Sequence, residues 1–174
     1  MVGPNDPADV DHTAFAIDFN PLTYRMRGRA VHGNTPFNVP FISEIEPSLF
    51  QGGCEDGLVL PKHIKHVVSL YKWGKYTRHK GVKTFHEVTM YDSLEGPDRD
   101  NVVELATLVN SCREDGPTLV HCQAGLNRSG LVAGTALVLA GRTPQEAINL
   151  LRETRSPAVL CNPVFEEWLL KFHE

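Results

Sequence analysis

Short runs of apolar residues, some alternating with polar ones, predict five β-strands in this chain. They lie at residues 41–45, 49–53, 66–71, 82–90 and 118–120. Pro47 separates the first two runs, which favours a hairpin at the edge of a sheet. The later runs are separated by longer segments, which is typical of strands joined by crossovers.

Apolar residues at helical spacing predict four helices in the last 75 residues. The first begins near Asn101, with Asp98 or Asp100 as its cap, and ends at Gly116-Pro117. The second is a buried helix from Leu131 to Ala140. Thr143-Pro144-Gln145-Glu146 is a capping box that begins the third, and Asn162-Pro163 begins the fourth. This order of elements predicts an α/β fold, with a central mixed, mostly parallel sheet flanked by helices on both faces.

Residues 1–40 differ in composition from the rest. They are rich in Pro, Gly, Asn and Asp and contain only brief apolar patches. We expect residues 1–40 to form an irregular or wrapping arm and residues 41–174 to form the domain. A small basic cluster at 24–29 fits a solvated arm better than a binding site.

The composition limits what the domain binds. A length of 174 residues with 41% hydrophobic content suits one core, and a monomer is expected. The net charge of −4 argues against a generic nucleic-acid or anionic-membrane surface. The first residues lack the features of a signal peptide, and the longest apolar stretch is too short to span a bilayer. We expect a soluble cytoplasmic protein.

Four cysteines occur at spacings that do not suggest a zinc site, and we expect neither a metal nor another cofactor. They are Cys54, Cys112, Cys122 and Cys161. This usage fits a reducing cytoplasm.

The loop from Val120 to Gly130 joins the strand at 118–120 to the helix that follows. A helix N-terminus presents backbone N–H groups and partial positive charge, so it binds oxyanions and stabilises a thiolate. Such a setting, with a cationic neighbour, lowers the pKa of a cysteine thiol from its usual value of about 8.5. Cys122 is therefore the candidate nucleophile.

The other residues of this loop suit phosphoryl transfer. The guanidinium of Arg128 can hold two oxygens of one phosphoryl group. Ser129 can donate a hydrogen bond to the sulfur, and His121 is expected to fix the shape of the loop from below. Phosphate binding is assigned to the loop as a whole, which consists of Gln123, Ala124, Gly125, Leu126, Asn127 and Arg128. The alternative is a structural cysteine that is buried where the strand joins the helix, but such a cysteine would not need the arginine, the serine and two glycines beside it.

The string His-Cys-x5-Arg-Ser, from His121 to Ser129, resembles the signature of the cysteine-dependent protein tyrosine phosphatase superfamily. The compact domain is similar to the dual-specificity branch. The resemblance implies hydrolysis of phosphate monoesters through a cysteinyl-phosphate intermediate.

Such a reaction needs an acid to protonate the leaving group. Asp92 lies thirty residues before Cys122 at the end of a predicted strand, and Asp92-Ser93 is similar to the acid loop of dual-specificity phosphatases. Asp98 and Asp100 compete for this role, but the position of each is also explained by capping the following helix. Trp73 and Tyr76 could wall the pocket, although core packing is the commoner role of such rings.

The loop carries no lysine between Cys122 and Arg128, unlike loops that hydrolyse phosphoinositides. A phosphoprotein or phosphopeptide is therefore the expected substrate, with phosphotyrosine and phosphoserine or phosphothreonine both accepted in a shallow cleft. Asn127-Arg128-Ser129-Gly130 also resembles the loop of RNA 5′-triphosphatases, so the RNA 5′ end stays open as an alternative. A non-catalytic phosphate-binding module is the third possibility. A disulfide from Cys54, Cys112 or Cys161 could protect Cys122.

Overall fold

The computed structural model describes residues 30–32, 35–37, 40–54, 58–72 and 74–173. Within the predicted arm, β1 (Ala30–His32) pairs antiparallel with β2 (Thr35–Phe37). Residues 1–29, which include the basic cluster at 24–29, lie outside the described residues, and so does Trp73. The division of the chain at residue 40 therefore stays a prediction.

The central sheet has five strands in the order β3-β4-β7-β5-β6. They are β3 (Ile42–Glu46), β4 (Leu49–Gly52), β5 (His66–Ser69), β6 (Thr84–Glu87) and β7 (Thr118–His121). Only the β3–β4 pair is antiparallel. The predicted mixed, mostly parallel sheet is confirmed, with β3 at its edge. Several strands are shorter than predicted, because their hydrogen bonds to the neighbouring strand end before the run of apolar residues does.

Four helices follow the predicted order: α1 (Arg99–Asp115), α2 (Arg128–Leu139), α3 (Pro144–Thr154) and α4 (Pro163–Leu170). The predicted caps are present. The Asp98 carboxylate accepts from the N–H of Asn101 at 2.9 Å, and Thr143 forms the capping box with Glu146. The helix α2 begins at Arg128, three residues earlier than predicted. Among the described residues, no helix combines the length and apolar character needed to cross a membrane.

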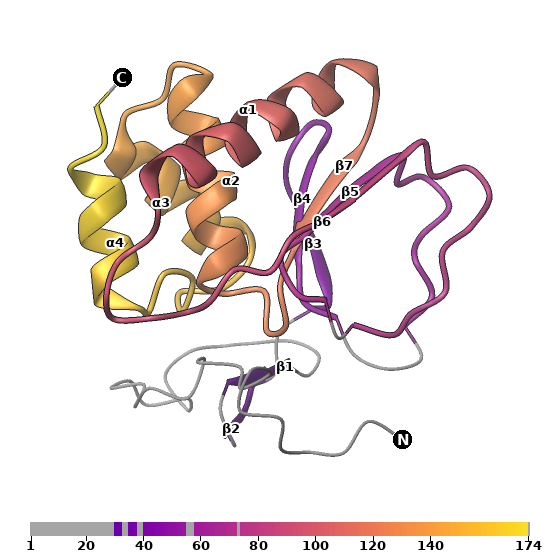
Figure 1. Ribbon diagram of the computed structural model, residues 1–174, viewed down its shortest axis with the longest axis horizontal. Helices are drawn as coiled ribbons and strands as arrows, with labels where there is room; N and C mark the ends of the chain where they lie inside the picture. Colours follow the sequence, from indigo (N-terminus) through magenta and orange to yellow (C-terminus); the bar gives the residue numbers. More distant parts are fainter. Residues whose placement is uncertain (1–29, 33–34, 38–39, 55–57, 73, 174) are drawn as a thin grey trace.

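The described helices lie on one face of the sheet, as Figure 1 shows. Alternation along the strands sends Val68 and Val120 into the core beneath the helices, whereas Val67 and Leu119 face the other way. That second face is covered by the connections on either side of β5, through residues such as Leu60, Ile64, Tyr76 and Phe85. The α/β class with a sheet flanked by helices is confirmed. In the described part of the chain, however, the second face is covered by these connections and not by a helix.

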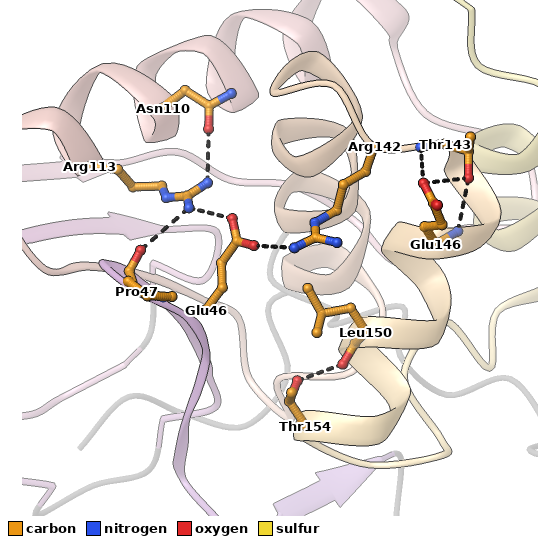
Figure 2. Close-up of polar contacts among 9 residues, drawn as sticks. All are labelled: Glu46, Pro47, Asn110, Arg113, Arg142, Thr143, Glu146, Leu150 and Thr154. Atoms are coloured by element: carbon orange, nitrogen blue, oxygen red, sulfur yellow. Dashed lines mark hydrogen bonds and ion pairs between the residues drawn. The ribbon is translucent and has the colours of Figure 1, made fainter.

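An ion-pair network fixes the edge strand to the helical layer (Figure 2). The Glu46 carboxylate at the end of β3 accepts from Arg113 of α1 and, at 2.7 Å, from Arg142 between α2 and α3. Burial raises the pKa of Glu46, but hydrogen bonds from Arg142 and Arg113 outweigh it and hold that pKa below its ordinary value. The network therefore holds β3 and β4 in place behind the loop that follows β7.

Candidate active site

Six residues, Cys122 to Asn127, connect the end of β7 to the start of α2. Although Asn127 is the N-cap residue of α2, its side chain makes no capping hydrogen bond to that helix. The first turn of α2 therefore lacks a side-chain cap that would compete with an anion for its N–H groups. This arrangement is typical of an anion-binding helix N-terminus.

Cys122 is 1% exposed, and its sulfur lies inside this loop. The backbone N–H of Gly125 donates to Sγ at 3.3 Å, and Sγ lies 3.4 Å from Oγ of Ser129. The Gln51 side chain on β4 holds this serine by donating to its Oγ at 3.1 Å. N–H and O–H groups placed in this way are donors of the kind that stabilise negative charge on sulfur.

Gly125 allows the tight bend that aims its N–H at the sulfur. Its φ is +71°, and a Cβ here would lie 2.3 Å from the backbone carbon of Gly52 and 2.4 Å from the Arg155 guanidinium. Both the backbone conformation and the packing therefore require glycine.

We expect Gly125→Ala to destabilise the protein by about 3 kcal/mol or more, because the clash with backbone adds to a conformational cost of about 1 kcal/mol. Gly141→Ala is the matched control. Gly141 also has a positive φ, +105°, but a Cβ there would meet nothing within 4 Å. Urea unfolding should show that Gly141→Ala loses only the conformational cost of about 1 kcal/mol. Equal losses of unfolding free energy in the two variants would contradict the role assigned to Gly125.

His121 lies under the loop, between the active cysteine and a tyrosine. Its Nδ1 is 3.2 Å from the Cys122 carbonyl oxygen, and its Nε2 is 2.7 Å from the Tyr76 hydroxyl. Burial lowers the pKa of His121 to about 4, so the ring is neutral at pH 7. Since a carbonyl can only accept, Nδ1–H donates to Cys122 and the Tyr76 hydroxyl donates to Nε2. The pair thus fixes the start of the loop.

Arg128 opens α2 and is fully buried. Its Nη1 donates to the Met90 carbonyl at 3.2 Å, and its guanidinium carbon lies 5.6 Å from the centre of the Tyr71 ring. Met90 lies two residues before Asp92, so these contacts bring the cation between the catalytic loop and the candidate acid loop.

A second buried guanidinium, that of Arg155, supports the loop from behind. It donates to the carbonyl oxygens of Gly125 at 2.6 Å, Ala124 at 3.3 Å and Pro40 at 2.8 Å, and to Oγ of Ser43 at 3.1 Å. Burial lowers the pKa of Arg155 to about 10, although the nearby Cys122 acts in the opposite direction. Arg155 is therefore a cation at pH 7, and its hydrogen bonds fix the orientation of these loop carbonyls.

Asp92 lies against the loop, 2% exposed. Its carboxylate accepts from the Asn127 amide at 2.8 Å and from the Asn162 amide at 2.6 Å. The structure thus brings Asp92 to the site, whereas Asp98 caps α1 and Asp100 is exposed in the first turn of that helix. These contacts give Asp92 a structural role, because they link the candidate acid loop to the catalytic loop and to the start of α4.

The remaining predicted residues lie along the same loop. Ala124 and Leu126 are buried, and their carbonyl oxygens accept from Arg155 and from the N–H of Leu160. Gln123 is half-buried, and its carbonyl accepts from the N–H of Cys54. In the described part of the chain, no group of three or more His, Cys, Asp or Glu side chains could hold a metal ion.

None of the four cysteines forms a disulfide. Burial raises the pKa of Cys161 to about 12 and also raises that of Cys112. Both groups are therefore thiols at pH 7. The protective disulfide stays a prediction.

Sequence reasoning missed three residues that build the site: Gln51, Arg155 and Asn162. Asn162 was identified only as a helix cap, which it is, since its Oδ1 accepts from the N–H of Val164. No local pattern marks the other two, because Arg155 reaches the loop across 30 residues and Gln51 reaches Ser129 across 78. Tyr76 was assigned to pocket or core packing, and its hydrogen bond to His121 was not foreseen.

Comparison with known proteins covers most of the chain. A family model described as "Dual specificity phosphatase, catalytic domain" matches residues 57–174. The MAP kinase phosphatase with leucine-rich repeats protein 3 of Dictyostelium discoideum is 32% identical over 94 residues, which are 52% of this chain and 11% of that protein. Mouse dual specificity protein phosphatase 15 is 31% identical over 91 residues, 51% of this chain and 38% of the relative. The aligned part is thus a minor fraction of each relative's length.

Solved structures share the fold at lower identity. A mouse putative dual specificity phosphatase complexed with zinc tungstate has a TM-score of 0.60 at 22% identity, covering 76% of this chain and 86% of that one. Human DUSP28 has a TM-score of 0.59 at 22% identity, with 76% and 92% covered. PTPMT1 in complex with PI(5)P has a TM-score of 0.57 at 16% identity, with 75% and 95% covered. These identities support the fold alone.

Proposed function

Because the chain belongs to the dual specificity phosphatase catalytic-domain family, we propose that it hydrolyses phosphate monoesters of phosphoproteins. The substrates are phosphotyrosine and phosphoserine or phosphothreonine residues, and the reaction passes through a cysteinyl-phosphate intermediate. The proposal rests above all on the Cys122 sulfur, which accepts a hydrogen bond from the backbone N–H of Gly125, in the loop before α2, and lies beside the Ser129 hydroxyl. The names of the curated relatives also describe protein phosphatases.

In the first step, the Cys122 thiolate attacks phosphorus and the bond to the leaving oxygen breaks. Backbone N–H groups of residues 123–128 and the Arg128 guanidinium bind the phosphoryl oxygens as charge shifts onto them. For this, Arg128 would turn from the Met90 carbonyl toward the anion. The departing alkoxide or phenolate takes its proton from Asp92.

In the second step, water attacks the cysteinyl phosphate and releases inorganic phosphate. The Asp92 carboxylate takes the proton from the water, as microscopic reversibility requires. The leaving thiolate receives a hydrogen bond from Ser129, which Gln51 holds within 3.4 Å of the sulfur.

Two substrate classes can be compared directly. We expect the protein to release phosphate from phosphopeptides much faster than from 5′-triphosphorylated RNA. Phosphate release from both, measured with the same enzyme preparation, tests this choice. A clear preference for the RNA would replace the proposed function with the RNA 5′-triphosphatase alternative.

We expect Asp92→Ala to lower turnover of phosphoserine peptides by about 10²-fold, but that of nitrophenyl phosphate much less. A nitrophenolate leaves without protonation, whereas a serine alkoxide does not. Steady-state kinetics with both substrates measures the difference. Since Asp92 also accepts from Asn127 and Asn162, equal losses on both substrates would indicate a purely structural role and exclude the acid role.

A further inference from the structure

A glutamine occupies a core position of the central sheet. Gln51 on β4 is fully buried and lies in register with Val120 of β7, which is in turn in register with Val68 of β5. Side chains in register on parallel strands share a face, so Gln51 continues a row of two valines beneath the helices. The glutamine therefore brings a polar group into an apolar layer, where it needs hydrogen-bond partners.

The nitrogen of the Gln51 amide reaches two residues of the catalytic site. Nε2 donates to the Gly125 carbonyl oxygen at 3.2 Å and to Oγ of Ser129 at 3.1 Å. Both of these residues also contact the Cys122 sulfur, Gly125 through its N–H at 3.3 Å and Ser129 through Oγ at 3.4 Å. One amide nitrogen thus holds two residues that each place a hydrogen-bond donor beside the sulfur.

The Gly125 carbonyl fixes which way the Gln51 amide faces. A carbonyl oxygen can only accept, so the amide turns its nitrogen, and not its oxygen, toward Gly125 and Ser129. Because Nε2 can only donate, the Ser129 oxygen accepts from it, and the hydroxyl hydrogen of Ser129 is left for another acceptor. The Cys122 sulfur lies 3.4 Å from that oxygen and, once ionised, can only accept. The amide therefore directs the serine hydroxyl to the sulfur.

This orientation is unfavourable for the other end of the same amide. Oε1 of Gln51 is buried and has no hydrogen-bond partner among the described residues. A reversed amide would give Oε1 the hydroxyl hydrogen of Ser129, but it would also place two oxygens against each other at Gly125. Since a buried acceptor without a partner destabilises a fold, Gln51 contributes less to stability than an apolar side chain of similar size would. The side chain suits the sulfur site better than it suits the core.

We propose that Gln51 is a positioning residue for breakdown of the cysteinyl phosphate, and that it acts through Ser129, whose hydroxyl it directs to the Cys122 sulfur. This inference rests on the proposed function and names a residue that controls its second step. In that step the bond between sulfur and phosphorus breaks and its electron pair goes to sulfur, while water forms the new bond to phosphorus and gives its proton to Asp92. Ser129 keeps its own proton and stabilises the departing thiolate by a hydrogen bond.

The two steps of the reaction depend differently on this hydrogen bond. It stabilises the thiolate, which leaves in the second step but attacks in the first. With nitrophenyl phosphate, the rate of the initial burst of nitrophenolate reports the first step, and the slower steady release that follows reports the second. We expect Gln51→Met to lower the steady rate about ten-fold, as for loss of one hydrogen bond to a charged group, and to change the burst rate much less.

Further comparisons separate positioning from a structural role. Gln51→Met/Ser129→Ala should lose no more of the steady rate than Ser129→Ala alone, since both changes remove the same hydrogen bond. Thr135→Val is the matched control, because it removes a buried hydroxyl that bonds only within α2, and it should leave both steps unchanged. The urea midpoint of Gln51→Met should equal or exceed that of the wild type, because the Gly125 carbonyl keeps Arg155 as a donor.

An unchanged steady rate, equal slowing of both steps, additive losses in the double variant or a clearly lower urea midpoint would each overturn the proposal. If the wild type hydrolysed neither nitrophenyl phosphate nor phosphopeptides, the proposed function would fail, and alkylation would decide the role of Gln51. Mass spectrometry of the Cys122 peptide gives the rate of alkylation by iodoacetamide at fixed pH, which reports the ionised fraction of the sulfur. Several-fold slower alkylation in Gln51→Met than in the wild type supports the proposal, and equal rates overturn it.

Discussion

Replacing Cys122 with serine is expected to lower phosphopeptide hydrolysis by at least about 10⁴-fold while binding is retained. A serine hydroxyl is not ionised at pH 7 and cannot form the cysteinyl phosphate. The anion site itself consists of backbone N–H groups and Arg128, which the substitution leaves in place. Phosphate release together with titration of a labelled phosphopeptide measures both halves of this prediction.

Cys112→Ser is the matched control, because Cys112 is also buried but lies in α1. Its activity should stay near that of the wild type. If Cys122→Ser and wild-type protein bound the peptide equally and neither hydrolysed it, the chain would be a non-catalytic phosphate-binding module. Residual wild-type turnover in Cys122→Ser would exclude a cysteine nucleophile.

Arg155→Met is expected to lower the free energy of unfolding by about 3–5 kcal/mol and to reduce turnover in the protein that still folds. The change leaves the buried carbonyl oxygen of Ala124 without its donor and removes one of the two donors to that of Gly125, where Gln51 still donates at 3.2 Å. It also removes a cation near Cys122. Urea unfolding measures the first effect. Kinetics at low temperature, on protein whose circular dichroism is native, measures the second.

Arg142→Met provides the comparison for Arg155. Arg142 is also an arginine, but its partner is a carboxylate, that of Glu46, and its side chain is 42% exposed. An exposed ion pair contributes about 1 kcal/mol or less, so both stability and activity should change little. Similar losses in the two variants would contradict the assigned role of Arg155.

Features encoded over three or four residues were predictable from the sequence. Asp98, Thr143 and Asn162 cap their helices as predicted, because each cap bonds to an N–H two or three residues along. The loop from His121 to Ser129 could also be identified from the sequence, since its cysteine, glycine and arginine lie within one short segment between a strand and a helix.

Features that depend on distant parts of the chain were not predictable. The second face of the sheet is covered by Leu60 and Ile64, which lie in connections without helical or strand periodicity. Arg155 reaches the loop across 30 residues, and Gln51 reaches Ser129 across 78. In the sequence these are ordinary polar residues at the end of a helix and in a strand.

The account depends most on one physical claim: backbone N–H groups and Arg128 hold a tetrahedral anion directly above an ionised Cys122 sulfur. A crystal structure with vanadate tests it most directly. We predict vanadium bonded to Cys122 Sγ, with its oxygens bound by the N–H groups of residues 123–128 and by the Arg128 guanidinium. Vanadate bound elsewhere, with the sulfur still enclosed and no anion in the loop, would contradict it.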